Sequence, residues 1–464
     1  MSNSKINIVG IGCDLQSENE EASRKYAIEN LSGGEKDRIN WMTKNMSMNK
    51  AYVYSSINKN KIESKKLLGQ FNNNYIEYRK KWKNQPIASF NKKLYGKKFK
   101  EKKFSPLCFD IEVASICDLA CAFCYRQYVS TPDKIMKKEL AFKLIDQASK
   151  MSIPSMKFNW RGEPLLNPSL PEIVDYAKQK GILETMINTN ATKLDKKMSE
   201  KIIKSGLDIM IYSFDGGTKK IYEKMRPGRF TKNNFDDIYK NILNFSKIRK
   251  KLNSIFPRTK IQMILTDETR KEQEEYFRLF KDIVDEVSVK QYTERGGNLT
   301  DLDKKFDGEL KEKKDVLIKE FGGDAVLMKD SKNNIFISNE RLPCEQPFQR
   351  LLTTYDGKAG MCCYDWGATH TVGYLDKLGY ENGEKEYANI KKKAENKKKG
   401  FEMMNLEMPK KNNMPEKKVN GLESIWHGED INKVRKAHIE DKAGSISICK
   451  SCPFKETYKW KKIN

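Results

Sequence analysis

Short apolar runs alternate with amphipathic helical stretches through the middle of this chain. The strand-like runs are residues 106–114, 155–160, 184–190, 208–214, 259–265 and 286–292. The helical stretches between them are residues 137–150, 170–181, 196–206, 235–248 and 271–283. This alternation predicts a parallel sheet with helices outside it. Six such units are too few for a closed eight-unit barrel, so the sequence predicts an α/β fold built on a partial (β/α)6 barrel.

Three cysteines follow the first expected strand directly, in the sequence CDLACAFC: Cys117, Cys121 and Cys124. Functional residues of barrels and open α/β sheets lie at the C-terminal ends of the strands, so this loop is expected at that edge. A closed zinc or iron–sulfur site needs four protein ligands. Three thiolates can hold a four-iron cluster with one iron open to a ligand that is not protein. A zinc ion with a distant fourth ligand is the alternative.

Composition and charge indicate which kinds of partner and which cellular compartment to expect. The chain has 464 residues, enough for two or three domains, and 88 basic against 63 acidic side chains give a net charge of +25. The lysines are dispersed, so the charge is attributed to overall composition, and a nucleic-acid partner is not expected. No apolar run approaches the ~20 residues of a membrane helix, and the first residues lack the pattern of a signal peptide. We therefore expect a cytoplasmic protein whose cysteines bind metal and do not form disulfides.

The cysteine loop, with Phe123 just before its last cysteine, resembles the cluster loop of the radical S-adenosylmethionine (radical SAM) enzymes. The resemblance implies a [4Fe–4S] cluster on Cys117, Cys121 and Cys124, with its open iron chelated by S-adenosylmethionine. It also implies cleavage of that cofactor by one electron, to a 5′-deoxyadenosyl radical that abstracts hydrogen from a substrate. A low-potential electron donor such as flavodoxin or ferredoxin is then an expected partner.

Motifs after the second and third expected strands extend the resemblance. WRGEPLLNP resembles the family's Gly-Gly-Glu-Pro motif: Gly162 and Glu163 match, and Arg161 replaces the first glycine. The Glu163 carboxylate is expected to accept hydrogen bonds from the ammonium group of the methionine moiety. In INTNAT, Asn188 and Asn190 fit the family's polar turn beneath the cofactor.

The stretch after the fourth expected strand contains Ser213, Asp215 and Arg226. By resemblance, Ser213 and Arg226 hold the carboxylate and ribose region of the cofactor, and Asp215 occupies the family's Ser-x-Asp-Gly position. A guanidinium offers a carboxylate two parallel, charge-assisted hydrogen bonds, which a lysine does not. The whole set of matches covers roughly residues 105–295.

Four more cysteines, Cys344, Cys362, Cys449 and Cys452, lie near the C-terminus. A hairpin-like stretch with Gly357 at its turn separates the first two, and the last two form a Cys-x2-Cys pair. Four such residues can close one metal centre, and their spacing allows either zinc or an iron–sulfur cluster. The region resembles the twitch domain, the shortened form of the SPASM domain, which implies one auxiliary [4Fe–4S] cluster.

If an auxiliary cluster lies beside the substrate, the resemblance implies that the cluster accepts an electron from the substrate radical while a base on the protein takes a proton. Asp365 stands where related enzymes supply such a base, although it can equally cap its own turn. Tyr364 and Arg295 are further candidates for the same pocket. Cys363 and Cys108 are expected to be thiols that bind no metal, and no chemistry is assigned to the histidines.

The expected domains follow from these assignments. They are a mainly helical N-terminal extension of unknown role (1–100), the radical SAM core (101–300), a linker or insertion (301–342), and a SPASM/twitch-like domain (343–464) with a lysine-rich insertion (376–420).

The expected reaction is an oxidation of a small metabolite, such as a sugar, an aminocyclitol or a nucleotide-sugar. A basic protein would suit the last of these, which is anionic. A SPASM-type maturase of peptide or protein side chains is the alternative. The first 100 residues do not resemble the winged-helix module of peptide maturases, which favours the small substrate. A nucleic-acid-modifying or nucleic-acid-binding iron–sulfur protein is suggested by net charge alone.

Overall fold

The computed structural model describes residues 104–124, 126, 131–254, 256–291, 327–329, 335–382, 418–450, 452 and 456–463, together with five helical residues between 74 and 85. Most of the predicted N-terminal extension, much of the predicted linker, Arg295 and most of the lysine-rich insertion lie outside the described residues. In the described part of the chain, no helix is both long and apolar enough to cross a bilayer.

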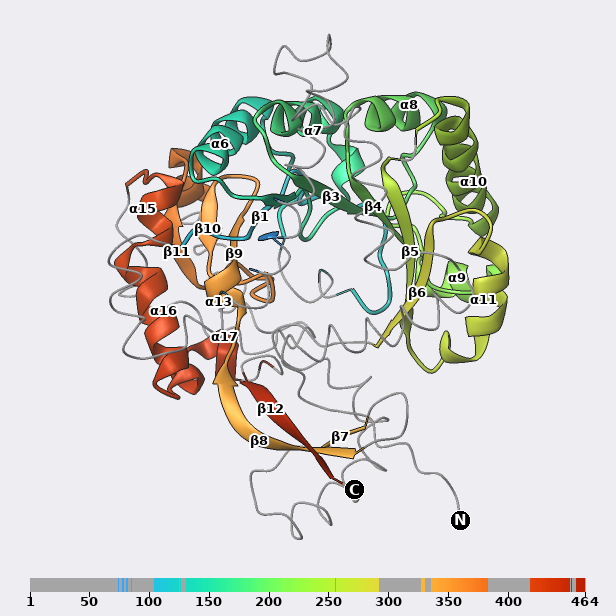
Figure 1. The fold of residues 1–464 in the computed structure, drawn as a ribbon. Coiled ribbons are helices and arrows are strands. Elements are labelled where there is room, and N and C mark those ends of the chain that lie inside the picture. Colours follow the sequence, from blue (N-terminus) through green and yellow to red (C-terminus); the bar gives the residue numbers. More distant parts are fainter. Residues whose placement is uncertain are drawn as a thin grey trace, which may run out of the picture.

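The core of the fold is one sheet, in which the described residues contribute nine strands in the order β11-β10-β9-β1-β2-β3-β4-β5-β6. Its parallel strands in chain order are β1 (Cys108–Ile111), β2 (Ser155–Lys157), β3 (Glu184–Thr189), β4 (Ile209–Ser213), β5 (Arg258–Leu265) and β6 (Glu286–Gln291). Each pairs in parallel with the next, so the predicted partial (β/α)6 barrel is confirmed. Figure 1 shows these strands curving in an arc with the helices along its outer side.

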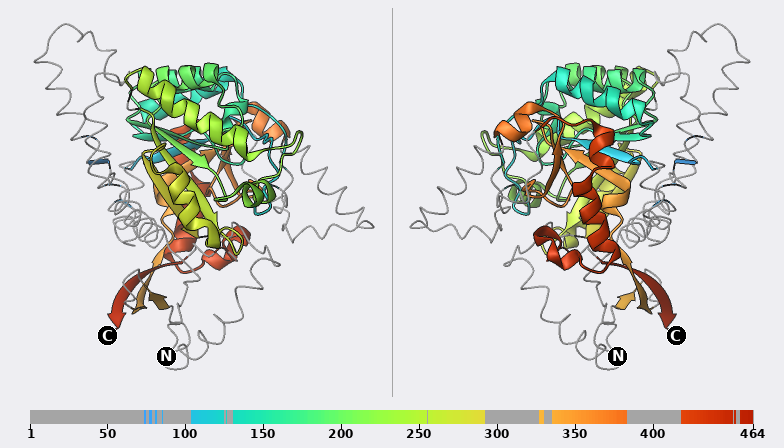
Figure 2. Two further views of the ribbon diagram at one scale, coloured as in Figure 1. Left: turned by 90° about the vertical axis from the view of Figure 1, so that its right-hand side faces the viewer. Right: turned by 90° about the vertical axis from the view of Figure 1, so that its left-hand side faces the viewer.

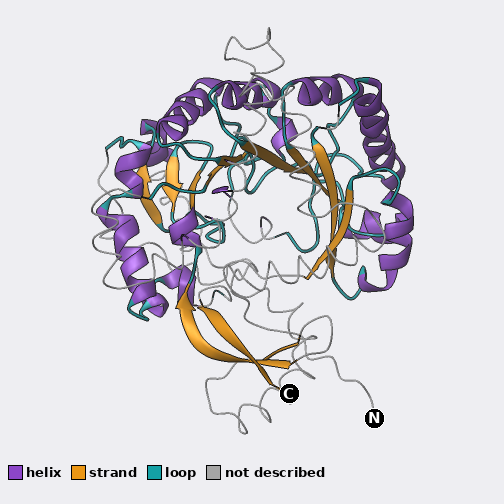
Figure 3. Cartoon of the chain, in the orientation of Figure 1, coloured by secondary structure: helices purple, strands orange, loops and turns teal. Residues whose placement is uncertain are grey.

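Helices connect the parallel strands along the outer side of the sheet, as Figure 3 shows. They are α6 (Lys138–Lys150), η3 (Pro164–Leu166), α7 (Leu170–Gln179), α8 (Lys196–Lys204), α9 (Lys219–Met225), α10 (Phe235–Lys251), η4 (Arg270–Glu272) and α11 (Gln273–Phe280). Asp195, Thr218 and Asn234 cap the N-termini of α8, α9 and α10 by accepting from backbone N–H groups of the first turn. The short helix α9 had not been predicted as a separate element.

Strand periodicity determines which side chains reach the inner side of the arc. Ile187 of β3, Tyr212 of β4 and Ile261 of β5 belong to the apolar core and are fully buried. Side chains alternate along a strand, so their neighbours point to the opposite face. Those neighbours include Asn188 and Ser213, and the inner face is therefore rich in polar groups.

The C-terminal cysteine region joins the same sheet. The helix α13 (Gln346–Gln349) leads into β9 (Arg350–Thr353), which pairs in parallel with β1, and β10 (Lys358–Gly360) and β11 (Thr371–Tyr374) follow in antiparallel order. Gly357 stands at the β9–β10 turn with a φ of 89°, so the predicted hairpin is confirmed.

Further helices cover the edge that these strands form: α15 (Leu422–Trp426), α16 (Glu429–Ile439), η6 (Ala443–Ser445) and α17 (Ser447–Lys450). Both α15 and α16 contact β11, and they are the red helices beside the sheet in Figure 2. A separate three-stranded sheet has the order β12-β8-β7 and comprises β7 (Leu327–Lys329), β8 (Ile335–Pro343) and β12 (Glu456–Ile463).

Two described residues of the N-terminal part contact the opposite, N-terminal end of the barrel. The hydroxyl of the buried Tyr78 donates to Oε1 of Glu184, the first residue of β3, at 3.3 Å. The Gln85 amide donates to the backbone carbonyls of Ser105 and Phe348. Tyr78 and Gln85 therefore pack at the end of the barrel that lies away from the cysteine loop.

Candidate functional site

The three clustered cysteines lie in the loop after β1, at the C-terminal edge of the sheet as predicted. The loop packs against the end of α9 and the residues that follow it: Ala120 and Ala122 donate backbone hydrogen bonds to the carbonyls of Pro227 and Met225, at 2.8 and 3.1 Å. The Cys121 side chain is buried, whereas Cys117 and Cys124 are half-buried. The end of the α9 segment therefore holds the cysteine loop in place.

Burial raises the pKa of two of these thiols, Cys117 and Cys121. It raises the pKa of Cys121 to about 12, although the nearby Arg226 charge acts in the opposite direction, and it also raises that of Cys117. A bound metal ion deprotonates such thiols outright, so three thiols in a shielded loop are a donor set suited to an iron–sulfur cluster. In the described ranges, no three Cys, His, Asp or Glu side chains form a ready-made metal-binding group. The assignment of ligands therefore rests on the loop and its surroundings.

Gly162 lies directly beneath the cysteine loop. A Cβ atom added there would lie 2.3 Å from the carbonyl oxygen of Ala114 and 2.4 Å from that of Ile116. The next residue, Glu163, donates its backbone N–H to the Ile116 carbonyl at 2.9 Å. The backbone at the end of β2 thus contacts the start of the cysteine loop, and only glycine fits at position 162.

The Glu163 carboxylate joins the ends of β2 and β3. It accepts from the Thr189 hydroxyl at 2.7 Å, from the Asn190 backbone N–H at 2.7 Å and from the Leu165 N–H at 3.0 Å. A carboxylate offers about four acceptor sites, so most of its capacity is used within the protein. The predicted hydrogen bond from a cofactor ammonium group would use the remaining acceptor capacity of this carboxylate.

Burial raises the pKa of Glu163 from its ordinary 4.5 to about 7. The folded protein therefore holds this proton more tightly than the unfolded chain does. The raised pKa stabilises the wild type relative to a Glu163→Gln variant. This stabilisation is fully present below about pH 4.5 and is lost as the pH rises through about 7, with a total change of about 3 kcal/mol. Urea denaturation of both proteins between about pH 4 and about pH 8 checks this expectation. Parallel pH profiles of the two proteins would contradict it.

Asn190 contacts the cysteine loop from the end of β3. Its amide donates to Oδ1 of Asp118 at 2.8 Å and lies 4.0 Å from Sγ of Cys117. Asn188 lies on the inner face of the same strand, where its backbone N–H donates to the Asn159 amide oxygen at 2.8 Å. The buried Asn188 Oδ1 atom has no hydrogen-bond partner among the described residues, so it is available to a ligand inside the arc.

A buried ion pair connects β4 and the α9 segment to the cysteine loop. The Arg226 Nε atom donates to Oδ2 of Asp215 at 2.5 Å, and the Ile264 backbone N–H donates to the other carboxylate oxygen. The Arg226 Nη1 atom is 3.6 Å from Sγ of Cys121, and the guanidinium lies 5.6 Å from the centre of the Phe123 ring. Burial alone would lower the pKa of Arg226, but the Asp215 carboxylate more than offsets this and the guanidinium stays charged.

The structure thus brings most of the predicted residues of the first site together. Phe123 belongs to the cysteine loop, Asn190 and Arg226 contact that loop, and Glu163 and Asp215 hold these two residues in position. Ser213 is the last residue of β4, half-buried and on the inner face, two positions before Asp215.

One of the four C-terminal cysteines, Cys362, lies near two of the others. Cys362 lies within electrostatic range of Cys344, Cys363 and Cys452, and its pKa is raised, first by a hydrogen bond with the Cys363 thiol and then by burial. Cys452 forms a backbone turn with Cys449, donating to its carbonyl at 3.2 Å. This grouping suits a further metal centre.

Sequence reasoning assigned no role to the histidines, but His438 is buried against a predicted ligand. Its Nε2 atom lies 3.5 Å from Sγ of Cys449. The two residues are brought together by the packing of α16 on α17 through η6, which no local sequence signal reveals. His438 therefore joins the candidate residues of the second site.

The Asp365 carboxylate accepts three hydrogen bonds within its own turn. One carboxylate oxygen accepts from the backbone N–H and the hydroxyl of Thr369, and the other accepts from the backbone N–H of His370 at 2.7 Å. This is the capping arrangement that the sequence allowed. The role of Asp365 as a base stays a prediction.

Comparison with known proteins agrees with this geometry. Residues 111–283 match the profile of the Radical SAM superfamily. Relatives include Fe-coproporphyrin III synthase of Methanosarcina barkeri, 35% identical over 104 residues, which are 22% of this chain and 25% of that protein. The GTP 3′,8-cyclase of Chlorobaculum tepidum is 34% identical over 106 residues, 23% of this chain and 32% of that protein. The chain thus spans a quarter to a third of the length of these curated relatives.

Among solved structures, the complex of BtrN with AdoMet and 2-DOIA covers 75% of this chain and 93% of its own, at 14% identity and a TM-score of 0.39. Streptococcus suis SuiB bound to the precursor peptide SuiA covers 73% and 75%, at 16% identity and a TM-score of 0.44. Scores this low carry no argument, so the conclusion rests on the sequence profile together with the barrel and its cysteine loop. Residues 111–283 of this chain are a radical SAM domain.

Proposed function

We propose that this protein is a radical SAM enzyme that holds a [4Fe–4S] cluster on Cys117, Cys121 and Cys124. The observation that carries this proposal is the position of the Arg226 guanidinium, which is buried, charged and 3.6 Å from Sγ of Cys121 at the C-terminal edge of the barrel. When bound, the cluster supplies the electron that cleaves S-adenosylmethionine to methionine and a 5′-deoxyadenosyl radical.

The side chains around the loop bind and orient the cofactor. The Arg226 guanidinium offers charge-assisted donors to a carboxylate, while Asp215 fixes its position. The buried Asn188 amide oxygen accepts a hydrogen bond from a polar group inside the arc. Glu163 keeps the ends of β2 and β3 in register beneath the cofactor. The burial of these groups excludes water from the reacting atoms.

The second cysteine group holds an auxiliary [4Fe–4S] cluster on Cys344, Cys362, Cys449 and Cys452. When bound, it accepts the electron that remains on the substrate after hydrogen abstraction. The substrate then loses one hydrogen atom, one proton and one electron, which together make a two-electron oxidation. Asp365 is the proposed proton acceptor, through the acceptor capacity that its three hydrogen bonds within the turn leave unused.

The substrate is proposed to be a small metabolite, and the basic composition of the chain suits an anionic one such as a nucleotide-sugar. The names of the relatives refer to a porphyrin and a nucleotide, both small molecules. A sugar, an aminocyclitol or a nucleotide-sugar fits this class, and a peptide side chain is the alternative.

Iron and sulfide analysis of anaerobically reconstituted protein tests the two-cluster arrangement. The wild type is expected to hold about eight irons, because each cluster contains four. A Cys117, Cys121, Cys124→Ala variant and a Cys344, Cys362, Cys449, Cys452→Ala variant are each expected to hold about four. The auxiliary cluster would be refuted if the wild type held about four irons and the second variant held the same number.

The substrate class has its own measurement. Formation of 5′-deoxyadenosine is expected to rise above the substrate-free rate when nucleotide-sugars or aminocyclitols are added to the reduced enzyme, with deuterium transfer from a labelled substrate. A rise with peptides alone would favour the maturase alternative.

A further inference from the structure

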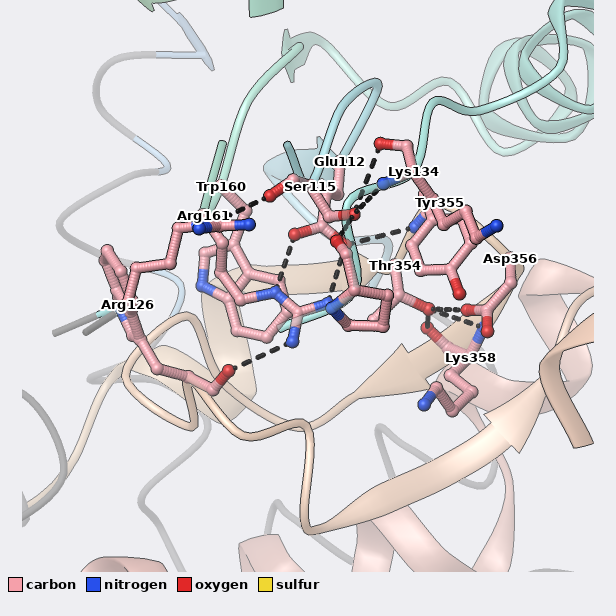
Figure 4. Close-up of polar contacts among 12 residues, drawn as sticks. Glu112, Ser115, Arg126, Lys134, Trp160, Arg161, Thr354, Tyr355, Asp356 and Lys358 are labelled. Carbon is pink, nitrogen blue, oxygen red and sulfur yellow. Dashed lines mark hydrogen bonds and ion pairs between the residues drawn. The ribbon is translucent and has the colours of Figure 1, made fainter. Parts of the chain in front are cut away.

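Arg161, the residue that departs from the family's Gly-Gly-Glu-Pro motif, forms a buried bidentate ion pair with Glu112 of the segment after β1. The Arg161 Nε and Nη2 atoms donate to the two Glu112 carboxylate oxygens at 2.6 and 2.8 Å. Glu112 is fully buried and Arg161 is 5% exposed. Figure 4 shows the two side chains facing each other at the centre of a polar network. The pair therefore connects the chain just before the cysteine loop to the end of β2.

The same pair reaches the C-terminal cysteine region. The Arg161 Nη1 atom donates to the backbone carbonyl of Trp366 at 3.2 Å, and the Tyr355 backbone N–H donates to Oε2 of Glu112 at 3.2 Å. Tyr355 follows β9, and Trp366 lies four residues after Cys362. Each member of the pair thus contacts the backbone of the segment that carries the second cysteine group.

A small apolar cluster lies beside the pair and contacts both cysteine regions. Its buried members are Trp160, Leu352, Trp366 and Ala368, and Cys124 and Cys363 both pack against it. The Trp160 indole also donates to the Cys363 carbonyl at 2.8 Å, and the Arg161 guanidinium lies 4.3 Å from the centre of the Trp160 ring. One apolar cluster therefore separates the last cysteine of the first loop from the residue next to Cys362.

We propose that Glu112 and Arg161 are a pair of positioning residues that fix the first cysteine loop relative to the second across this apolar cluster. The proposal rests on the proposed function, because it assigns the pair the task of holding two metal centres at a constant separation. The pair forms hydrogen bonds with the backbone of Tyr355 and Trp366. It acts through Trp160 and Trp366, whose packing it determines.

The chemistry of the pair supports a positioning role. A planar guanidinium makes two parallel hydrogen bonds to one carboxylate and still has a donor left for the Trp366 carbonyl, which an ammonium group cannot reproduce in the same geometry. A buried ion pair gives little net stability, but its directional bonds can specify one arrangement of the elements around it. Sites that depend on a separation between two centres need such support from rigid neighbouring groups.

The fold contains a matched control elsewhere in the barrel. Arg249 of α10 donates to both carboxylate oxygens of Asp285, the residue before β6, at 2.5 and 2.9 Å. This pair is also bidentate and largely buried, and it joins a helix to the sheet. Asp285 also accepts from the Thr259 backbone N–H, at the N-terminal end of β5, so the pair lies at the end of the barrel opposite the first cysteine loop. Replacing Arg249 with lysine therefore disturbs a comparable ion pair outside the apolar cluster.

The experiment compares Arg161→Lys with Arg249→Lys in the full chain by amide hydrogen exchange. In Arg161→Lys we expect exchange to accelerate at least about tenfold in both the 115–124 and the 362–370 segments, because both lose the same support. In Arg249→Lys these two segments are expected to exchange as in the wild type. Equal effects of the two substitutions, or acceleration confined to the neighbourhood of residue 161, would overturn the proposal.

A second readout uses the reconstituted protein. Electron paramagnetic resonance of the reduced wild type is expected to show magnetic interaction between two clusters, and Arg161→Lys is expected to change this interaction while the iron content stays at the wild-type value. An unchanged interaction would contradict the positioning role. If the protein binds only one cluster, the auxiliary-cluster proposal fails in the iron analysis, whereas the exchange experiment still decides whether the pair holds the two loops together.

Discussion

Replacing Gly162 with alanine is expected to lower the free energy of unfolding by about 3 kcal/mol or more, at the high end of overpacking effects. The added Cβ would lie 2.3 and 2.4 Å from the carbonyl oxygens of Ala114 and Ile116, and 2.8 Å from the carbonyl carbon of Ser115. All three are backbone atoms, so no side-chain rotation relieves the contact. The chain that leads into the cysteine loop must move, and we expect the variant to bind less iron as well.

Urea denaturation measures the loss of stability, and Gly444→Ala provides the control. Gly444 is exposed, and an added Cβ there meets nothing within 4 Å. Its replacement is expected to change the free energy of unfolding by no more than about 0.5 kcal/mol. A Gly162→Ala protein as stable as Gly444→Ala would show that the backbone before the cysteine loop is free to move, contrary to the packing described above.

Replacing Arg226 with methionine is expected to destabilise the protein by about 3–5 kcal/mol, because it leaves the Asp215 carboxylate buried without its partner. Asp215 is fully buried and keeps only the hydrogen bond from the Ile264 backbone N–H. The double variant Asp215→Asn, Arg226→Met is expected to recover part of this loss, since no buried charge remains. A double-mutant cycle from denaturation curves gives the interaction energy of the pair.

Lys219→Met is the control for this pair. Lys219 stands on the same α9 helix and pairs with Asp236, but both side chains are more than half exposed. Its replacement is expected to have little effect, because exposed ion pairs contribute little to stability. If Arg226→Met were as mild as Lys219→Met, the Asp215–Arg226 pair would not support the cysteine loop in the way the structure indicates.

The barrel could be predicted from the sequence because its signals are local. A run such as residues 259–265 alternates between core and inner-face positions, and the helices that follow carry one apolar side. The cysteine loop and the motifs near Glu163 and Asp215 lie at successive strand ends, so their meeting at one edge follows from the order of parallel strands.

Contacts between distant segments could not be predicted in this way. The parallel pairing of β9 with β1 joins residues that are about 240 positions apart along the chain, as the Arg350–Asp110 contact illustrates. The ion-pair partner of Arg161 could not be predicted for the same reason, although the sequence showed that Arg161 departs from the family motif. His438 meets Cys449 only because α16 and α17 pack against η6.

The structure also shows a role for Glu163 that the sequence did not suggest. Its carboxylate was predicted to bind a cofactor group, but most of its acceptor capacity goes to Thr189, Asn190 and Leu165. A motif shows which side chain lies at a strand end. It does not show which backbone donors the neighbouring strand end presents to that side chain.

The most direct test of the account is reductive cleavage of S-adenosylmethionine by the reconstituted, reduced protein. The wild type is expected to form 5′-deoxyadenosine and methionine, and the Cys117, Cys121, Cys124→Ala variant is expected to form neither. Cys108→Ala removes a buried thiol of β1 outside the loop and is expected to leave the reaction intact. Cleavage that persists without the three cysteines, or a wild type that binds iron but never forms 5′-deoxyadenosine, would contradict the account.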